Sequence, residues 1–321
     1  MRAVQVLTTT GPSDIVVTEV PDAVAAPGQV LVEVHTVGIS FPDLLLSRGE
    51  YQLRPEPPFT LGVDFAGVVV SGDGFEPGQR VAGVGGYGGA AELVVGSAEN
   101  VFVLPDAISF DEAVALPMNY LTALFALDER GGLKAGETVL VHGAAGGVGT
   151  ATLQVAKGLG ATTIAVASTE EKRAFALAAG ADHAIAVEGF KDAAREITGG
   201  RGVDVVLDVV GGSLFTDSLR SLAPLGRLLV VGFAAGEGIP EVKVNRLLLN
   251  NADVRGVGWG AYAFANPGYM ARQWAQLVPM IEAGVVKPPI GKAYPIDGFG
   301  QALLDMDARA TLGKSVVRIR D

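Results

Sequence analysis

The feature that most constrains this chain is a glycine-dense turn between an apolar run and an Ala-rich run. The sequence Thr-Val-Leu-Val-His-Gly-Ala-Ala-Gly-Gly-Val-Gly at 138–149 places Gly143, Gly146 and Gly149 at G-x-x-G-x-x-G spacing. Without side chains the backbone can turn tightly and approach an anion, which the first N–H groups of a following helix then face. A P-loop is excluded because no lysine follows Gly149. The order strand, glycine turn, helix is typical of a dinucleotide-binding βαβ unit.

The region that starts with this turn alternates between strand-like and helix-like patterns. Strands are predicted at 138–141, 163–167, 184–187, 203–209, 227–231 and 253–257, and helices at 148–158, 170–179, 190–198 and 213–222. Such alternation predicts an α/β domain with a doubly wound, largely parallel sheet of about six strands.

The region before the turn has a different character. Up to about residue 117 it consists of strand-like runs, such as the alternating 30–37, that prolines and glycines interrupt. It predicts an irregular, antiparallel, barrel-like domain. After Gly260 the βα alternation stops, and helices at 269–283 and 299–307 precede a strand at 315–319. We therefore expect a first domain of 1–117 completed by 267–321, a second of 118–266, and a ligand cleft between them.

The composition limits the classes of function. The 321 residues are 49% hydrophobic, enough for two cores, and include no cysteine, which excludes disulfides, thiolate zinc sites and a cysteine nucleophile. The net charge of −11 comes from 24 Lys and Arg against 35 Asp and Glu, and argues against a nucleic-acid partner. No apolar run approaches the roughly 20 residues of a membrane span, and no secretory signal is visible. We expect a cytoplasmic protein with no membrane partner.

Several further motifs carry a family resemblance over nearly the whole chain. They are Gly-Glu-Tyr at 49–51, Pro-Pro-Phe-Thr-Leu-Gly-Val-Asp-Phe-Ala-Gly-Val-Val at 57–69, the glycine turn, Asp-Val-Val-Gly-Gly at 208–212 and Gly-Lys at 313–314. Together they resemble the medium-chain dehydrogenase/reductase superfamily, and within it the zinc-free quinone oxidoreductase, or zeta-crystallin-like, branch. The resemblance implies a GroES-like β-rich catalytic domain, a Rossmann domain, bound NADPH and a homodimer.

The positions of the catalytic zinc ligands differ from those of the zinc-binding relatives. Those relatives place a cysteine where this chain has Ser40, and a His-Glu pair where it has Val63 and Asp64. Asp43 and Asp64 remain, but two carboxylates without nitrogen or sulfur partners make a poor zinc site. We expect no metal.

The choice of nicotinamide cofactor depends on the end of the second strand. NAD-preferring domains carry an Asp or Glu there to hold the ribose 2′-OH, whereas this chain has Ser168, with Lys172 and Arg173 shortly after. A hydroxyl and cations attract a 2′-phosphate, which favours NADPH. The alternative is that Lys172 and Arg173 belong to a solvated helix face. Val187 stands where some bacterial relatives have a tyrosine that helps to hold the phosphate, so the preference for NADPH is expected to be modest.

The resemblance also implies the remaining cofactor contacts. Thr122 matches a residue near the nicotinamide carboxamide. The other matching positions are Gly143, Ala144, Ala145, Gly146, Gly147, Val148, Val209, Val210, Gly232, Phe233 and Lys314. Core packing is the alternative for the two valines, and a surface charge is the alternative for Lys314.

The expected chemistry follows from the absence of zinc ligands in the sequence. A quinone or an enone accepts hydride from NADPH without a Lewis acid, whereas oxidation of an alcohol requires a Lewis acid or a base. Ser40 and Tyr51 are the candidate catalytic residues, with the Tyr51 hydroxyl available to a carbonyl oxygen. Candidates for the substrate cleft are Phe41, Asp43, Trp259 and Tyr262. Ordinary packing is the alternative for the aromatic residues.

The expected function is therefore NADPH-dependent, metal-free hydride transfer to a quinone. A first alternative is reduction of the C=C bond of enals, enones or acyl thioesters, and a second is a non-catalytic, redox-sensing or structural protein that binds NADPH. A hydrolase is disfavoured because there is no G-x-S-x-G motif. His35, His142 and His183 show no ligand or triad spacing, and structural roles are expected for them.

Overall fold

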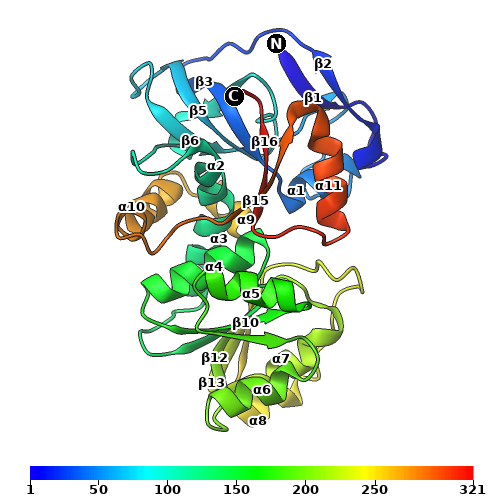
Figure 1. Cartoon of the computed structure of the whole chain (residues 1–321), viewed down its shortest axis with the longest axis vertical. Helices are drawn as coiled ribbons and strands as arrows, with labels where there is room; N and C mark the ends of the chain where they lie inside the picture. The colour runs from blue at the N-terminus through cyan, green and yellow to red at the C-terminus, as the bar shows by residue number, and fades with distance from the viewer. Residues whose placement is uncertain (321) are drawn as a thin grey trace. The chain divides into compact units, whose positions relative to one another are not determined.

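The computed structural model describes residues 1–320, which form two compact units (Figure 1). The first unit contains Met1–Met118, Pro267–Ala275 and the chain from Pro288 onward, and the second contains Asn119–Asn266 and Gln276–Lys287. The sequence predicted that all of 267–321 would join the first unit. Gln276–Lys287 instead groups with the second, where the Gln154 amide donates to Lys287 O at 2.9 Å and accepts from Lys287 N at 2.9 Å.

The first unit is built on two sheets. Strands β1 (Arg2–Val6), β2 (Ile15–Glu19) and β4 (Phe59–Thr60) form a small antiparallel sheet in the order β2-β1-β4. The larger sheet has the order β15-β16-β3-β5-β6-β8, with β7 also paired to β3. Its strands are β3 (Gln29–Gly38), β5 (Asp64–Gly72), β6 (Arg80–Val84), β7 (Leu93–Ser97), β8 (Val101–Val103), β15 (Ile290–Pro295) and β16 (Lys314–Arg318). Only the β15–β16 pair is parallel. The β-rich, GroES-like architecture is confirmed.

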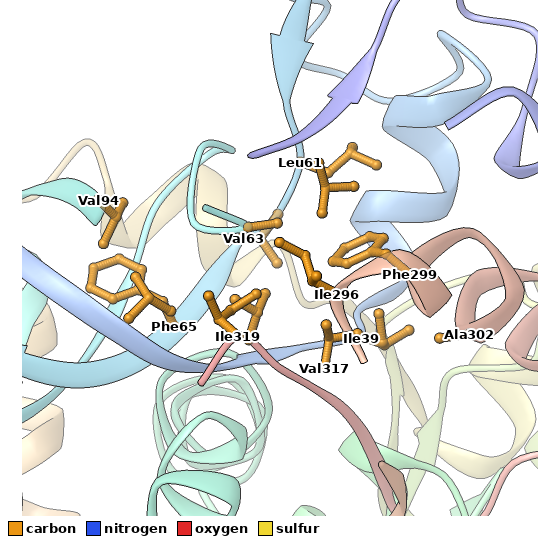
Figure 2. Close-up of a cluster of buried hydrophobic side chains, with 14 of the residues drawn as sticks. Ile39, Leu61, Val63, Phe65, Val94, Ile296, Phe299, Ala302, Val317 and Ile319 are labelled. Carbon is orange, nitrogen blue, oxygen red and sulfur yellow. The ribbon is translucent and has the colours of Figure 1, made fainter. Parts of the chain in front are cut away.

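The core of the first unit depends on the end of the chain. Strand β3 buries alternate residues, among them Val30, Val32 and Val34, because successive side chains of a strand point to opposite faces. Figure 2 shows Val317 from the last strand, and Ile319 directly after that strand, in the same cluster as Val63 and Phe65. Short helices accompany the sheets: α1 (Phe41–Ser47), α2 (Phe110–Ala113), the first part of α10 (Tyr269–Glu282) and α11 (Phe299–Asp307).

The second unit is the predicted parallel sheet with helices. Its strands are β9 (Thr138–His142), β10 (Thr162–Ala167), β11 (His183–Ala186), β12 (Val203–Asp208), β13 (Leu222–Val230) and β14 (Asp253–Gly256), all parallel, in the order β11-β10-β9-β12-β13-β14. Its helices are α3 (Leu121–Leu124), α4 (Gly147–Gly158), α5 (Glu170–Ala178), α6 (Phe190–Ile197), α7 (Phe215–Ser221), α8 (Asn245–Asn250) and α9 (Trp259–Ala263). All five residues of β9 are buried, as expected for a strand that is covered on both faces.

The order of the parallel strands determines where a ligand fits. From β9 the chain moves outward to β10 and β11, and then returns to β12 next to β9 before moving outward to β13 and β14. This reversal between β9 and β12 is a topological switch point, where loops leave the sheet in opposite directions and open a crevice at the carboxyl ends. The glycine turn follows β9, and Val209 follows β12. Among residues 1–320, no helix has the length and apolar character needed to cross a membrane.

Candidate functional site

The glycine turn has the shape of an anion cradle. Gly143 adopts a left-handed φ of +63°, and a Cβ on Gly149 would lie 2.2 Å from Gly143 O. A Cβ on Gly147 would lie 2.4 Å from Asn119 Nδ2. Gly146 is the N-cap of α4 and supplies no side-chain cap, and no acidic residue occupies the first turn of the helix. The N–H groups and the positive end of the helix dipole are therefore available to a pyrophosphate, and these residues fit a dinucleotide.

The turn after β12 packs against the glycine turn. A Cβ on Gly143 would lie 2.8 Å from Val209 Cγ2 and 3.4 Å from Val210 Cγ2. A Cβ on Gly211 would lie 3.0 Å from Phe233 Cδ1, and Phe233 is 39% exposed. The structure thus brings together the predicted cofactor residues that follow β9, β12 and β13, including Gly232. Val209 and Val210 are half-buried, so their side chains are partly packed and partly accessible.

The end of β10 carries hydroxyl groups and no carboxylate. Ser168 follows the last residue of the strand and is exposed, and Thr169 Oγ1 accepts a hydrogen bond from Lys172 N at 3.2 Å at the start of α5. Lys172 is half-buried, while Glu170 and Glu171 on the same first turn are exposed. Thr122 lies in α3, which packs against α4, and is 7% exposed.

In the first unit three predicted residues meet in a buried ionic cluster. Lys314 Nζ lies 2.7 Å from Asp64 Oδ2 and donates to Ser40 Oγ at 2.6 Å, while Ser40 Oγ donates to Asp64 Oδ2 at 3.0 Å. Asp64 is 0% exposed, Lys314 3% and Ser40 4%. Gly38 leaves the space, because a Cβ there would lie 2.2 Å from Asp64 Oδ1 and 2.3 Å from Lys314 Cε. Lys314 is therefore an internal cation and not the surface charge that the sequence left open.

The donor set of this cluster does not fit zinc. Ser40 and Asp64 occupy two of the positions where the zinc-binding relatives have ligands, and an ammonium already lies between their oxygens. Over residues 1–320, no group of three or more His, Cys, Asp or Glu side chains is arranged to hold a metal ion.

Asp43 is a second buried carboxyl group beside this cluster. Its Oδ1 accepts from Gly62 N at 2.9 Å and its Oδ2 accepts from Ser40 N at 3.2 Å. Burial, followed by the negative charge of Asp64, raises the pKa of Asp43 to about 7, although the two amides and Lys314 act in the opposite direction. Asp43 is fully buried, and its side chain does not line an open surface.

The raised pKa predicts a specific pH dependence of stability. Because Asp43 binds its proton more tightly in the folded state, its contribution is fully present below about pH 4 and is lost as the pH rises to about 7. Chemical denaturation of the wild type and of Asp43→Asn between pH 4 and 8 measures it. The free energy of unfolding of the wild type should fall relative to that of the variant, by at most about 4 kcal/mol.

A matched control separates this effect from the other carboxyl groups. The pKa of Asp305 is held at about 2 by hydrogen bonds from Tyr294, Gln301 and Lys292, and gives a pH dependence of the opposite sign. Only the difference from the variant is therefore informative. Asp106→Asn, at an exposed position, should follow the wild type at every pH. A constant difference between the wild type and Asp43→Asn would contradict the raised pKa.

The other substrate candidates fall into exposed and buried groups. Tyr51 is half-buried against the core of the first unit, and the pKa of its hydroxyl is raised by burial and by Asp43. Phe41 is 42% exposed. In the second unit Tyr262 is 41% exposed and stacks on Phe125 at a centroid distance of 5.4 Å, whereas Trp259 is 3% exposed. The rings of Phe41 and Tyr262 are thus partly exposed, each in its own unit, whereas the ring of Trp259 is buried in the second unit.

Sequence reasoning missed Asn119 and the pairing of His142 with Ser218. Asn119 is 5% exposed and its amide covers Gly147, which no local motif signals. His142 Nε2 lies 2.8 Å from Ser218 Oγ, and burial lowers the pKa of His142 to about 4. For His142, the sequence signal that could have indicated a role at the site was its position directly before the glycine turn.

Comparisons with known proteins find a matching protein family for each of the two regions of the chain. Residues 26–106 match the family model of the alcohol dehydrogenase GroES-like domain, and residues 147–283 match that of the zinc-binding dehydrogenase. The bovine (Bos taurus) quinone oxidoreductase-like protein 2 is 37% identical over 313 residues, which cover 95% of this chain and 89% of that protein.

Solved structures show the same likeness. A probable oxidoreductase from Mycobacterium abscessus superposes with a TM-score of 0.91 at 43% identity, covering 99% of this chain and 98% of its own. The Escherichia coli quinone oxidoreductase complexed with NADPH gives a TM-score of 0.88 at 28% identity, covering 99% of this chain and all of its own. These similarities, the GroES-like first unit and the parallel sheet with its glycine turn show that the chain is an oxidoreductase of the medium-chain dehydrogenase/reductase superfamily, in its zinc-free, quinone oxidoreductase-like branch.

Proposed function

We propose that this protein is an NADPH-dependent, metal-free oxidoreductase that transfers hydride to a quinone. The observation that carries the proposal is the glycine turn at the switch point, with hydroxyl groups and a lysine where an NAD-preferring domain has a carboxylate. The Escherichia coli quinone oxidoreductase, a structural neighbour of this chain, is complexed with NADPH, which supports the choice of cofactor.

In this proposal the second unit binds the cofactor. The backbone N–H groups of Gly147 and Val148 hold the pyrophosphate, and Ser168 with Lys172 holds the 2′-phosphate. Val209, Val210 and Phe233 pack against the nicotinamide side, and Thr122 contacts the carboxamide. When bound, NADPH supplies the hydride.

The first unit contributes the polar and aromatic groups for the acceptor. Tyr51 offers its hydroxyl to a carbonyl oxygen of the quinone, and the exposed ring of Phe41 stacks on a planar acceptor. Ser40 has a different role from Tyr51 and Phe41 in this proposal, because its hydroxyl already donates to Asp64 and accepts from Lys314. We propose that Ser40 and Lys314 position the start of α1, and with it Phe41, without touching the acceptor.

The direct test is a comparison of initial rates. Consumption of NADPH and of NADH is followed with a simple quinone and with an α,β-unsaturated ketone, each with and without a chelator. Quinone reduction that is faster with NADPH and insensitive to chelator supports the proposal. Turnover of the ketone alone points to a C=C reductase, binding without any turnover points to a non-catalytic protein, and loss of activity with chelator overturns the metal-free assignment.

The assignment of the 2′-phosphate site makes its own prediction. Lys172→Gln removes one charge-assisted hydrogen bond, so kcat/KM for NADPH should fall by about 10- to 100-fold while that for NADH stays near the wild-type value. Ser168→Ala should have a smaller effect in the same direction. Lys191→Gln, on α6 of the same unit, is the control and should change neither value. Equal losses with both cofactors would place the 2′-phosphate elsewhere.

We also propose that the protein is a homodimer that pairs through β14. This strand ends the order of the parallel sheet, and Val254 on it is 36% exposed. Leu248 and Leu249 on α8 are 76% and 75% exposed, which is unusual for leucines on a folded surface. Val254→Lys should shift the sedimentation coefficient toward that of a monomer. Val103→Lys, at an exposed strand position of the first unit, should leave it unchanged.

A further inference from the structure

A buried histidine and a buried aspartate lie side by side beneath the two turns of the proposed cofactor site. The parallel pairing of β9 with β12 matches Val141 with Leu207, so the next residues, His142 and Asp208, are neighbours at the carboxyl ends of their strands. Their side chains point to the same face of the sheet. His142 is 0% exposed and Asp208 is 1% exposed.

The hydrogen bonds assign the tautomer of His142. The Ser218 hydroxyl donates to Leu214 O at 2.8 Å, so its oxygen accepts the bond from His142 Nε2 at 2.8 Å. The proton of the neutral ring is therefore on Nε2, and Nδ1 presents a lone pair. Within the described chain, neither His142 Nδ1 nor Asp208 Oδ2 has a hydrogen-bond partner, although both atoms are buried.

The other oxygen of Asp208 organises the turn that follows β12. Asp208 Oδ1 accepts from Val210 N at 2.8 Å and from Gly211 N at 2.9 Å. The carbonyls of this turn then hold the next loop, because Ala234 N donates to Val209 O at 3.1 Å and Ala235 N donates to Val210 O at 2.9 Å. One carboxylate thus fixes the positions of Val209 and Val210, and through them the loop that carries Phe233.

We propose that His142 and Asp208 are positioning residues for NADPH, which hold the glycine turn and the turn after β12 against each other. The inference rests on the proposed function, because it concerns the same cofactor site. His142 anchors the end of β9 by its bond to Ser218 on α7, and Asp208 anchors the end of β12 by its bonds to two amides. Neither side chain touches the cofactor in this assignment.

The tautomer makes one substitution diagnostic. In Asp208→Asn the amide oxygen can still accept from Val210 N and Gly211 N, and we expect the new N–H group, in place of the unpaired Oδ2, to donate to the neighbouring buried acceptor His142 Nδ1. The turn therefore keeps its shape and a buried acceptor gains a donor. In Asp208→Ala both amides lose their acceptor, and the turn is released.

The test compares NADPH dissociation constants, measured by the change in NADPH fluorescence on binding. Asp208→Ala should raise the constant at least about tenfold, and Asp208→Asn should bind as tightly as the wild type or more tightly. His142→Phe keeps the ring packed edge-on against Phe190 but loses the bond to Ser218, and should also raise the constant several-fold. His183→Gln, an exposed histidine in β11 of the same sheet, is the control and should bind like the wild type.

A second readout separates this inference from the proposed function. Nitrogen-15 spectra of the three histidine side chains report the tautomer of His142 in the free protein, and its Nδ1 signal should shift in Asp208→Asn as that atom accepts a hydrogen bond. If the wild type binds no NADPH, the proposed function fails and the spectra still test the pair. The inference is overturned if Asp208→Ala or His142→Phe folds and binds NADPH like the wild type, if Asp208→Asn binds as weakly as Asp208→Ala, or if Nδ1 carries the proton.

Discussion

Lys314→Met is expected to lower the free energy of unfolding by about 3–5 kcal/mol, because it leaves the carboxylate of Asp64 in the interior without its cation. The methionine keeps much of the volume of the lysine stem, so the loss reports the charge and not a cavity. The Ser40 hydroxyl also loses the donor that lies 2.6 Å from it. Urea denaturation at neutral pH measures the change.

Two variants show whether the buried charge is the cause. Lys314→Met combined with Asp64→Asn removes both charges, and should be more stable than Lys314→Met alone, as a double-mutant cycle would show. Lys292→Met breaks a pair with Asp305 of similar length, 3.1 Å, but the lysine side chain is 63% exposed. It should cost much less than Lys314→Met, because water screens an exposed ion pair. Equal losses at Lys314 and Lys292 would contradict the internal-cation assignment.

Gly149→Ala is expected to damage the second unit and abolish tight cofactor binding. Its Cβ would lie 2.2 Å from Gly143 O and 2.7 Å from Ala144 Cα, and both are backbone atoms that cannot rotate away. The start of α4 must therefore move off the turn, at a cost of about 1–3 kcal/mol in stability. The displaced N–H groups no longer converge on one anion, so the dissociation constant for NADPH should rise more than about tenfold.

The same helix provides the control. Gly158 is the last residue of α4, and the three atoms nearest to a Cβ there all belong to the Met280 side chain, with Sδ at 2.8 Å. A methionine end rotates easily, so Gly158→Ala should keep both stability and NADPH affinity within about 1 kcal/mol of the wild type. If Gly149→Ala binds NADPH like Gly158→Ala, the glycine turn is not the pyrophosphate site.

The second unit was predictable because its signals are local. The apolar run, the glycine turn and the helix that follows are adjacent in the sequence, and the structure places β9 at Thr138–His142 and α4 at Gly147–Gly158, within a residue or so of the prediction. The six parallel strands were predicted by the same alternation. Strand β13 begins earlier than expected, at Leu222, because Leu222 pairs with Val203 before the regular register starts at Val205.

The ionic cluster was not predictable, because its members are distant in the sequence. Lys314 is 274 residues from Ser40 and 250 residues from Asp64 along the chain. No local sequence pattern around any of the three residues indicates that they meet. A lysine after a glycine near the end of a chain indicates neither burial nor an ion pair. The assignment of Gln276–Lys287 to the second unit also depends on tertiary contacts, here with the Gln154 amide on α4.

The place of β16 in the first unit also bears on the order in which a ribosome delivers the chain. Strand β16 at Lys314–Arg318 is one of the antiparallel partners of β3, and Val317 from β16 is buried in the core of the first unit. The residues of the second unit, up to Lys287, are all synthesised before that strand exists. Domains generally fold as units during synthesis, so the second unit should become protease-resistant on the nascent chain first. The first unit, although most of it is translated earlier, should then acquire its resistance only after β16 has emerged from the ribosome.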